Sequence, residues 1–205
     1  MNVSFKLLEV GGIFPSITGM RLPTKSKGDT IREIGVIGVK DKQLASNLIC
    51  KGTVHGKFQR GVQYWFEINM PRSIWSELDT YVIGMSPISS ESTMYTLTKE
   101  CAEITSDMFV EYTPKLTISD FKSAVTFLSD QYGGRKNIPI HILKSALPEG
   151  WLQKRNRVFS AQALKGMYRD RRGHRMPEWV IICSAIEQLP YFNELIIGCE
   201  TEDFE

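Results

Sequence analysis

The chain has 205 residues and lacks several features that mark common protein classes. No window holds the roughly 20 apolar residues that cross a bilayer. The first residues do not form a basic head followed by a long apolar stretch, so no secretory signal is visible. We therefore expect no membrane segment and a cytoplasmic protein. No Gly-x-Gly-x-x-Gly or Walker-type loop occurs, so neither a Rossmann nor a P-loop phosphate site is indicated.

Cysteine and histidine are scarce and scattered. The four cysteines, Cys50, Cys101, Cys183 and Cys199, stand far apart and form no Cys-x-x-Cys pair, and there are only three histidines. Zinc sites and disulfide frameworks normally show closer or repeated spacings of these residues. We expect reduced structural thiols and no metal site.

The composition is that of an ordinary folded protein, with 42% hydrophobic and 23% charged residues and a net charge of +2. The charge is unevenly placed. Residues 151–175 hold eight lysines and arginines and one acid, whereas residues 176–205 hold seven acids and no lysine or arginine. An anionic ligand would be sought first at the basic stretch.

The hydrophobic pattern predicts a single α+β domain over residues 1–205, with a small antiparallel or mixed sheet and a helical C-terminal half. Strands are expected at 3–10 and at 63–70, and a loop at 86–95. The predicted helices are 31–34, 71–84, 117–132, 138–146, 148–168 and one that begins at Pro177.

If residues 151–168 are helical, Arg155, Gln162 and Arg169 lie on one face, and Arg171 and Arg175 follow beyond it. Guanidinium groups make paired hydrogen bonds to phosphate oxygens, so this face suits a nucleotide. A solvated face balanced by the acidic tail would look the same. A nucleic acid is a second choice, because the aromatic residues of this stretch are spaced like core residues.

Two further patterns contain polar groups that could carry chemistry. His174 and Glu178 stand four residues apart at a helix start, where a glutamate also caps backbone amides. The hydroxyl-rich stretch Ser89-Ser90-Glu91-Ser92 could bind a phosphate, although serine loops are common. The pattern around His55 and His141 favours ordinary loop or packing histidines.

Taken in order, these segments resemble the flavin-dependent thymidylate synthases over roughly residues 50–195. The resemblance is carried by order and spacing, and the segments that carry it are the strand at 63–70, the helix at 71–84, Glu91-Ser92-x-x-Tyr95, Leu147-Pro148, the segment 151–168 and His174-x-x-x-Glu178. It implies a fold like that of the thymidylate synthase-complementing proteins.

The resemblance also implies a nucleotide site. With Leu164 on the leucine of the family's Asn-x-Arg-Ser-Leu motif, Arg171 occupies the position of the arginine that grips the pyrimidine nucleotide. Ser160 and Gln162 replace the asparagine and the first arginine of that motif. Arg171 is thus the candidate catalytic residue, and the candidate substrate-binding residues are Glu91, Ser92, Tyr95, Arg169 and Arg171.

The family's cofactors are FAD, methylenetetrahydrofolate and NADPH, and its members are homotetramers with active sites between subunits. The candidate cofactor-binding residues here are His55, Arg155, Ser160, Gln162 and His174. The family's Arg-His-Arg triplet is replaced by Val82-Ile83-Gly84, or by Thr80-Tyr81-Val82 in the other register, and Met94 replaces a later arginine.

Two functions follow. The first is an enzyme that transfers a one-carbon or related group to C5 of dUMP or a related pyrimidine deoxynucleotide. The alternative is a non-catalytic relative whose basic cleft binds a nucleotide, a nucleic acid or a protein partner. The loss of the basic triplet motivates the alternative.

Overall fold

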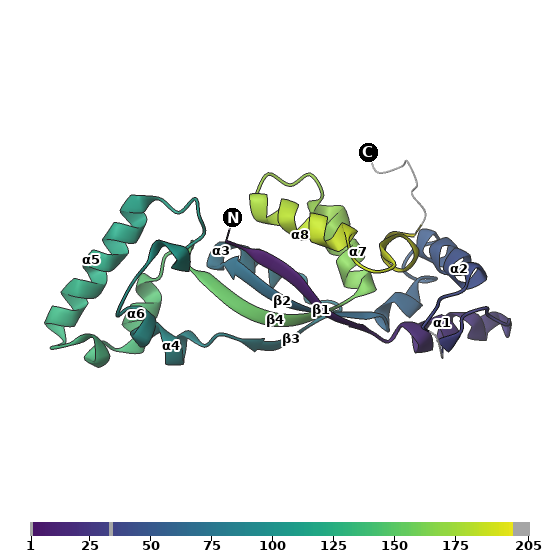
Figure 1. Cartoon of the computed structure of the whole chain (residues 1–205), viewed down its shortest axis with the longest axis horizontal. Helices are drawn as coiled ribbons and strands as arrows, with labels where there is room; N and C mark the ends of the chain where they lie inside the picture. The colour runs from purple at the N-terminus through teal and green to yellow at the C-terminus, as the bar shows by residue number, and fades with distance from the viewer. Residues whose placement is uncertain (1, 33–34, 199–205) are drawn as a thin grey trace. The chain divides into compact units, whose positions relative to one another are not determined.

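A computed structural model describes residues 2–32 and 35–198 (Figure 1). Four strands, β1 (Ser4–Gly11), β2 (Gln63–Pro71), β3 (Met85–Ser90) and β4 (Leu152–Ser160), form an antiparallel sheet in the order β1-β2-β4-β3. The predicted α+β class with a small antiparallel sheet is confirmed.

Strand β2 is central because it can bury one face completely. Tyr64, Phe66, Ile68 and Met70 alternate along it and are fully buried, which is the period-2 pattern of a strand with one face in a core. Strand β3 contains Pro87, which has no amide proton to donate to a neighbouring strand. Its place at the edge of the sheet accommodates that missing donor.

Eight α-helices lie in the described part of the chain. They are α1 (Ile13–Arg21), α2 (Val39–Cys50), α3 (Arg72–Leu78), α4 (Thr93–Glu100), α5 (Lys115–Gln131), α6 (Ile140–Ala146), α7 (Ala161–Arg171) and α8 (Pro177–Glu187). A π-helical turn at Phe192–Ile197 follows. The predicted helices at 117–132, at 138–146 and after Pro177 are confirmed.

Two predictions of local structure were wrong. Residues 148–168 form a strand and then a helix, because pairing within the sheet overrides the helix propensity of Gln153, Lys154 and Arg155. The segment 86–95, expected as a loop, contains β3 and the start of α4. Ile31 forms a bridge with Val36, and the predicted helix at 31–34 falls partly on residues 33–34, which lie outside the described part.

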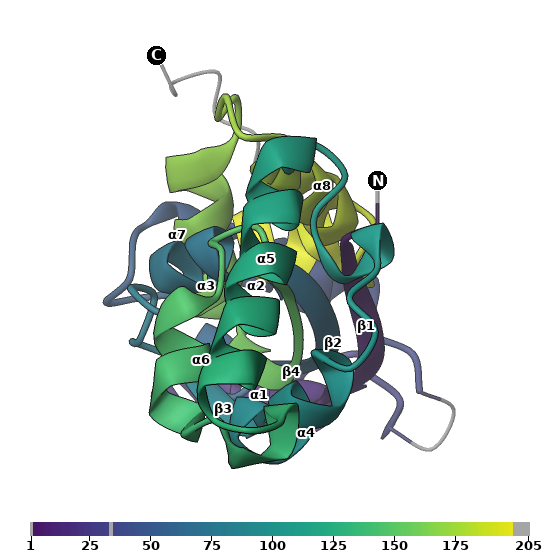
Figure 2. The same ribbon diagram turned by 90° about the vertical axis from the view of Figure 1, so that its left-hand side faces the viewer.

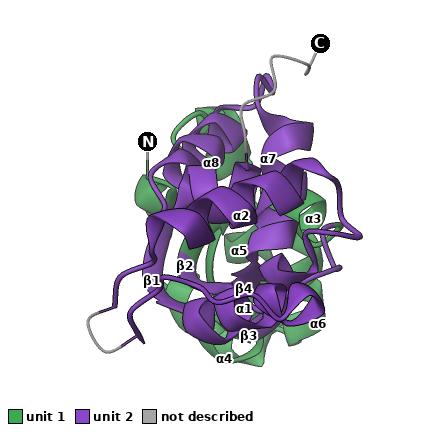
Figure 3. Cartoon of the chain, turned by 90° about the vertical axis from the view of Figure 1, so that its right-hand side faces the viewer, with its two compact units in different colours: residues 1–4, 68–80, 89–156 green, residues 5–67, 81–88, 157–205 purple. Residues whose placement is uncertain are grey.

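The chain divides into two compact units (Figure 3). The first unit comprises residues 1–4, 68–80 and 89–156, and the second unit comprises residues 5–67, 81–88 and 157–205. Each strand of the sheet contributes residues to both units.

The first unit has its own aromatic centre. Phe109, Phe121 and Trp151 meet edge to face, with ring centroids 5.3–6.2 Å apart. Helices α4, α5 and α6 of this unit, labelled in Figure 2, surround them. The other buried members of this core are Leu97, Cys101, Val125, Ile138, Leu143 and Leu147.

The second unit packs α7 and α8 against each other near the sheet (Figure 1). Phe5, Phe66 and Phe159 form an aromatic cluster in which Phe159 lies 5.8 Å from Phe66. The cluster explains why the segment ending at Ser160 pairs in the sheet. As a strand it buries Phe159 against two other rings.

Cys101 and Cys183 are buried free thiols, and burial raises the pKa of each to about 11. Cys50 is disulfide-bonded, so the expectation of reduced cysteines was wrong for this residue. Cys199 lies outside the described residues.

None of the described helices has the length and apolar character needed to span a membrane.

Candidate functional site

Arg171, the candidate catalytic residue, is the last residue of α7 and is held by aromatic side chains of the second unit. Its Nε donates a hydrogen bond to the Tyr81 hydroxyl at 2.9 Å. Its Cζ lies 4.5 Å from the centre of the Trp179 ring, which is within cation-π range. Trp179 is fully buried and meets Tyr81 edge to face. The guanidinium therefore packs against two aromatic rings that contact each other.

His174 completes this cluster. Its Nε2 lies 3.2 Å from Nη1 of Arg171, and its Nδ1 accepts a hydrogen bond from the Met176 amide at 3.2 Å. The imidazole also meets the Trp179 ring edge to face. Glu178, four residues after His174, is fully buried in the first turn of α8. The structure therefore brings Arg171 and His174 together, while their contacts with substrate and cofactor stay predictions.

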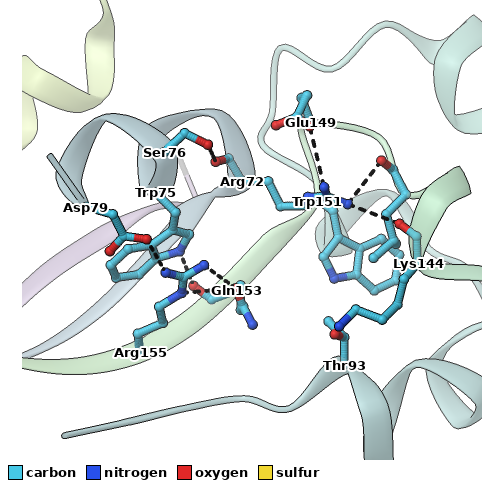
Figure 4. A pocket seen from close by; sticks show the side chains of 11 residues that line it. Arg72, Trp75, Ser76, Asp79, Thr93, Lys144, Glu149, Trp151, Gln153 and Arg155 are labelled. Atoms are coloured by element: carbon cyan, nitrogen blue, oxygen red, sulfur yellow. Dashed lines mark hydrogen bonds and ion pairs between the residues drawn. The ribbon is translucent and has the colours of Figure 1, made fainter. Parts of the chain in front are cut away.

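The first unit contains a polar pocket of about 310 Å³, which Figure 4 shows from close by. Three cations and two carboxylates line it, which leaves a formal charge of +1. The lining residues are Arg72, Trp75, Ser76, Asp79, Thr93, Lys144, Leu147, Glu149, Trp151, Gln153 and Arg155. They come from α3 and the residue that follows it, α4, α6, the segment before β4 and β4 itself.

Arg155 is fixed on one side of this pocket. Its Nη1 donates to Oδ2 of Asp79 at 2.9 Å, and its Nε and Nη2 donate to Oε1 of Gln153 at 3.0 and 2.8 Å. The guanidinium stacks 4.3 Å from the centre of the Trp75 ring. The Trp75 indole in turn donates to the Gln153 carbonyl at 2.9 Å. These contacts hold the guanidinium plane in one orientation.

Arg72 and Lys144 provide the positive charge on the other side (Figure 4). Nη1 of Arg72 donates to the carbonyls of Lys144 and Leu147, at the end of α6, and its Nη2 lies 3.5 Å from a Glu149 oxygen. Among residues 2–32 and 35–198, no carboxylate lies within ion-pair distance of the Lys144 ammonium. Lys144 is therefore the pocket cation that is most available to an anionic ligand.

The serine-rich stretch ends at the same unit's sheet edge. The Glu91 carboxylate accepts a hydrogen bond from the Lys154 amide at 2.8 Å, and the Glu91 carbonyl accepts one from the Gln153 side chain. Ser92 is the residue before α4, and Tyr95 is 82% exposed. Thr93, next to Ser92, lines the polar pocket. The structure thus connects Glu91 and the start of α4 to β4, while the substrate contacts of Ser92, Glu91 and Tyr95 stay predictions.

The remaining candidates lie on α7 or at its N-cap and have partners within the second unit. Gln162 accepts a hydrogen bond from Arg60 at 2.8 Å, and Arg169 pairs with its exposed neighbour Asp170 at 3.0 Å. Ser160 is buried, and its hydroxyl accepts from the Ala163 amide, which caps α7. The predicted common helical face of Arg155, Gln162 and Arg169 was wrong, because Arg155 lies on β4.

His55 lies apart from these groups in sequence and lines a different hollow of the second unit. This cleft has a volume of about 780 Å³ and is formed mostly by apolar residues of α1, α2 and the segment 54–61.

Among the described residues there is no group of three or more histidine, cysteine or acidic side chains that could hold a metal ion.

Several site residues were missed by the sequence reasoning. Trp75 has the spacing of a core residue on a helix, and it does pack inside, but one face of its ring also carries Arg155. Lys144 and Gln153 belong to segments more than 60 residues after α3. No local pattern links such distant positions. For Tyr81, the sequence offers one indication of a functional position, which is its alignment with the family's basic triplet.

Comparison with known structures identifies the fold. A flavin-dependent thymidylate synthase X from Helicobacter pylori, solved with FAD and dUMP, superposes with a TM-score of 0.74 and 19% identity over 98% of each chain. A second structure of the Helicobacter pylori enzyme with FAD and dUMP gives 0.73 and 18%, over 95% of this chain and 97% of that one.

A UMP/dUMP methylase, PolB from Streptomyces cacaoi, bound to 5-Br dUMP, superposes with a TM-score of 0.61 and 13% identity over 90% of this chain and 88% of that chain. No family sequence profile and no curated protein matches the sequence. The chain therefore has the fold of the flavin-dependent thymidylate synthases, and the resemblance in the order of segments is confirmed at the level of fold.

Proposed function

We propose that the chain is a methyltransferase-type enzyme that binds a pyrimidine deoxynucleotide such as dUMP and transfers a one-carbon group to C5 of its base. The observation that carries the proposal is the fold match over nearly the whole chain to proteins solved with dUMP or 5-Br dUMP. Fold alone does not assign a function. The proposal therefore rests also on residues of this chain that suit a nucleotide.

The polar pocket of the first unit suits the nucleotide phosphate. A phosphate monoester carries close to two negative charges and accepts several hydrogen bonds. The Lys144 ammonium would pair with it, the Thr93 hydroxyl would donate to it, and Arg72 and Arg155 would add positive potential. In this assignment Ser92 and Glu91 shape the entrance through their places at the start of α4 and beside β4.

Arg171 lies in the second unit and does not line the polar pocket. Its role of holding and polarising the pyrimidine base is proposed from the family resemblance, separately from the pocket. Charge that develops on a pyrimidine ring during substitution at C5 is stabilised by a fixed cation at its edge. Arg171 meets that requirement because Tyr81 and Trp179 restrict its guanidinium. We include Arg169 and Tyr95 as further substrate contacts, and the homotetramer of the family as the expected assembly.

The segment in the slot of the family's basic triplet bears on flavin binding. The triplet through which the family holds FAD is Thr80-Tyr81-Val82 or Val82-Ile83-Gly84 in this chain. The Tyr81 hydroxyl is engaged by Arg171, and Val82 and Ile83 are exposed apolar residues without side-chain donors. These positions do not fit an FAD held in the family's manner, so we derive no step through it. The proposed cofactor contacts of His55, Arg155, Ser160, Gln162 and His174 require their own test.

The same substitutions favour a second candidate, a non-catalytic relative that binds the nucleotide alone. A chain that kept the phosphate-binding cations but lost the flavin contacts would retain binding without group transfer. A nucleic-acid ligand would instead show binding that falls steeply with added salt.

Incubation with dUMP, methylenetetrahydrofolate, NADPH and FAD separates these functions. The enzyme should convert dUMP to a product heavier by one carbon and two hydrogens, measured by mass spectrometry, and Arg171→Ala should abolish the conversion while circular dichroism stays unchanged. If dUMP binds but its mass is unchanged with all three co-substrates, the binding-only function holds. If dUMP does not bind at all, both candidates are wrong.

A further inference from the structure

Arg72 connects two segments of the first unit that both border the polar pocket. It is the first residue of α3, and its amide donates to the Trp151 carbonyl at 3.1 Å. Its side chain extends to the end of α6, where Nη1 donates to the carbonyls of Lys144 and Leu147 at 3.4 and 3.3 Å. The main chain and the side chain of Arg72 are thus each held by hydrogen bonds.

Helix α6 depends on such support because it is short. It has seven residues and is followed by Leu147 and Pro148. Helices of fewer than about 12 residues are marginal by themselves, and the carbonyls of a last helical turn lack partners within the helix. The Arg72 guanidinium supplies donors and positive charge at this end, and both stabilise a helix C-terminus. Leu143, the residue before Lys144, is buried in the aromatic core of the first unit.

Lys144 and Thr93 line the pocket from two helices that share this core. Figure 4 shows the Lys144 ammonium on the side of the Thr93 side chain. Leu97, one turn after Thr93 on α4, is fully buried in the same core as Leu143. A phosphate oxygen bound by both polar groups must lie within about 3 Å of each. The separation between the end of α6 and the start of α4 therefore decides whether both groups can bind one phosphate.

We propose that Arg72 is a positioning residue that holds the end of α6 so that Lys144 meets the phosphate of the bound nucleotide. This inference rests on the proposed function, because it takes Lys144 as a phosphate ligand. The Arg72 guanidinium already binds two carbonyls at the end of α6 and lies 3.5 Å from a Glu149 oxygen. It acts through α6, and it need not touch the phosphate.

The test compares Arg72→Lys with Arg135→Lys. Each substitution keeps the positive charge but replaces a planar guanidinium with a single ammonium group. Arg135 is the matched control, because its Nη1 donates to the carbonyls of Cys101 and Ala102 at the end of α4, outside the polar pocket. Arg72→Lys is also combined with Lys144→Met. Two quantities are measured in the intact chain, the hydrogen exchange of the α6 amides by mass spectrometry and the dissociation constant for dUMP by calorimetry.

Arg72→Lys should speed hydrogen exchange in α6 and weaken dUMP binding about fivefold. The loss is partial because a lysine side chain is flexible and can follow part of the movement. In the Lys144→Met chain the same substitution should change the affinity by less than about twofold, because the positioned ammonium is already absent. Arg135→Lys should leave the affinity for dUMP at the wild-type value.

Equal weakening by Arg72→Lys in both chains would show that Arg72 acts independently of Lys144, and the positioning role would be wrong. Unchanged affinity in Arg72→Lys, while Lys144→Met weakens binding, would also overturn the positioning role but leave the proposed function standing. If the wild type does not bind dUMP, the proposed function is wrong and the role of Arg72 falls with it. Should Arg72→Lys fail to fold, Arg72→Gln takes its place, and the loss it causes should likewise vanish in the Lys144→Met chain.

Discussion

At the scale of single residues, Asp41 shows how hydrogen bonds stabilise a buried charge. It is buried on α2, and its carboxylate accepts hydrogen bonds from Arg21 Nε at 2.7 Å, from the Thr30 hydroxyl at 2.6 Å and from the Asp29 and Thr30 amides. Burial alone would raise its pKa, but these four donors hold the pKa of Asp41 below its ordinary value. One carboxylate thus secures the loop before α2.

Asp41→Asn should lower the free energy of unfolding by about 2–4 kcal/mol. The asparagine side chain is neutral. Its NH₂ group would face hydrogen-bond donors at a position where the carboxylate has an accepting oxygen. Urea denaturation measures the change. The exposed Asp130→Asn on α5 is the control and should stay within about 0.5 kcal/mol of wild type.

The same carboxylate gives a pH dependence. Because the folded-state pKa of Asp41 is depressed, its contribution is fully present above the ordinary aspartate pKa and is lost as the pH falls through the folded-state value. The difference in stability between wild type and Asp41→Asn should therefore shrink on acidification. A difference that does not change with pH would show that the charge of Asp41 is not the source of the stability.

At the scale of elements, the junction of β4 and α7 shows what local sequence can and cannot predict. Residues 152–155 favour a helix by propensity, yet they form a strand because β2 and β3 flank them. The change to helix occurs at Ser160. Its hydroxyl caps α7 through the Ala163 amide, and its own amide donates to the carbonyl of Gly84, whose φ of 80° suits glycine. The serine was visible in the sequence, but the strand before it was not.

Ser160→Ala should therefore destabilise the chain by about 1–2 kcal/mol, since it removes the cap and leaves the Ala163 amide without this acceptor. Thermal or urea unfolding measures the loss. Ser145→Ala, at an exposed serine in α6 whose hydroxyl donates to the Ile142 carbonyl, is the matched control and should have little effect. Equal stability of the two variants would contradict the capping role.

At the scale of the whole molecule, the sequence predicts the class of fold better than the site. The alternation in β2, the Gly133-Gly134 stop after α5 and the proline that opens α8 are local signals, and all three elements are present. The polar pocket depends instead on side-chain contacts between residues of α3 and residues of β4, which are more than 70 residues apart in the sequence. The positions of Lys144, Trp75 and Gln153 relative to one another therefore required the structure.

The uneven placement of charge along the sequence indicated a basic region, but it did not show how the structure divides that region. The basic stretch at 151–175 is divided between β4 and α7, so Arg155 and Arg171 belong to different clusters with different aromatic partners. Each arginine lies over the ring of a buried tryptophan, which is Trp75 for Arg155 and Trp179 for Arg171. The pattern predicted where an anion would be sought, but it did not predict which side chains would hold it.

The affinity of Lys144→Met for dUMP, measured by isothermal titration calorimetry beside wild type and Lys136→Met, tests the central claim most directly. Lys136 is an exposed lysine outside the pocket and serves as the charge-matched control. The proposal predicts binding at least about tenfold weaker for Lys144→Met and unchanged binding for Lys136→Met. Wild-type affinity in Lys144→Met would contradict it.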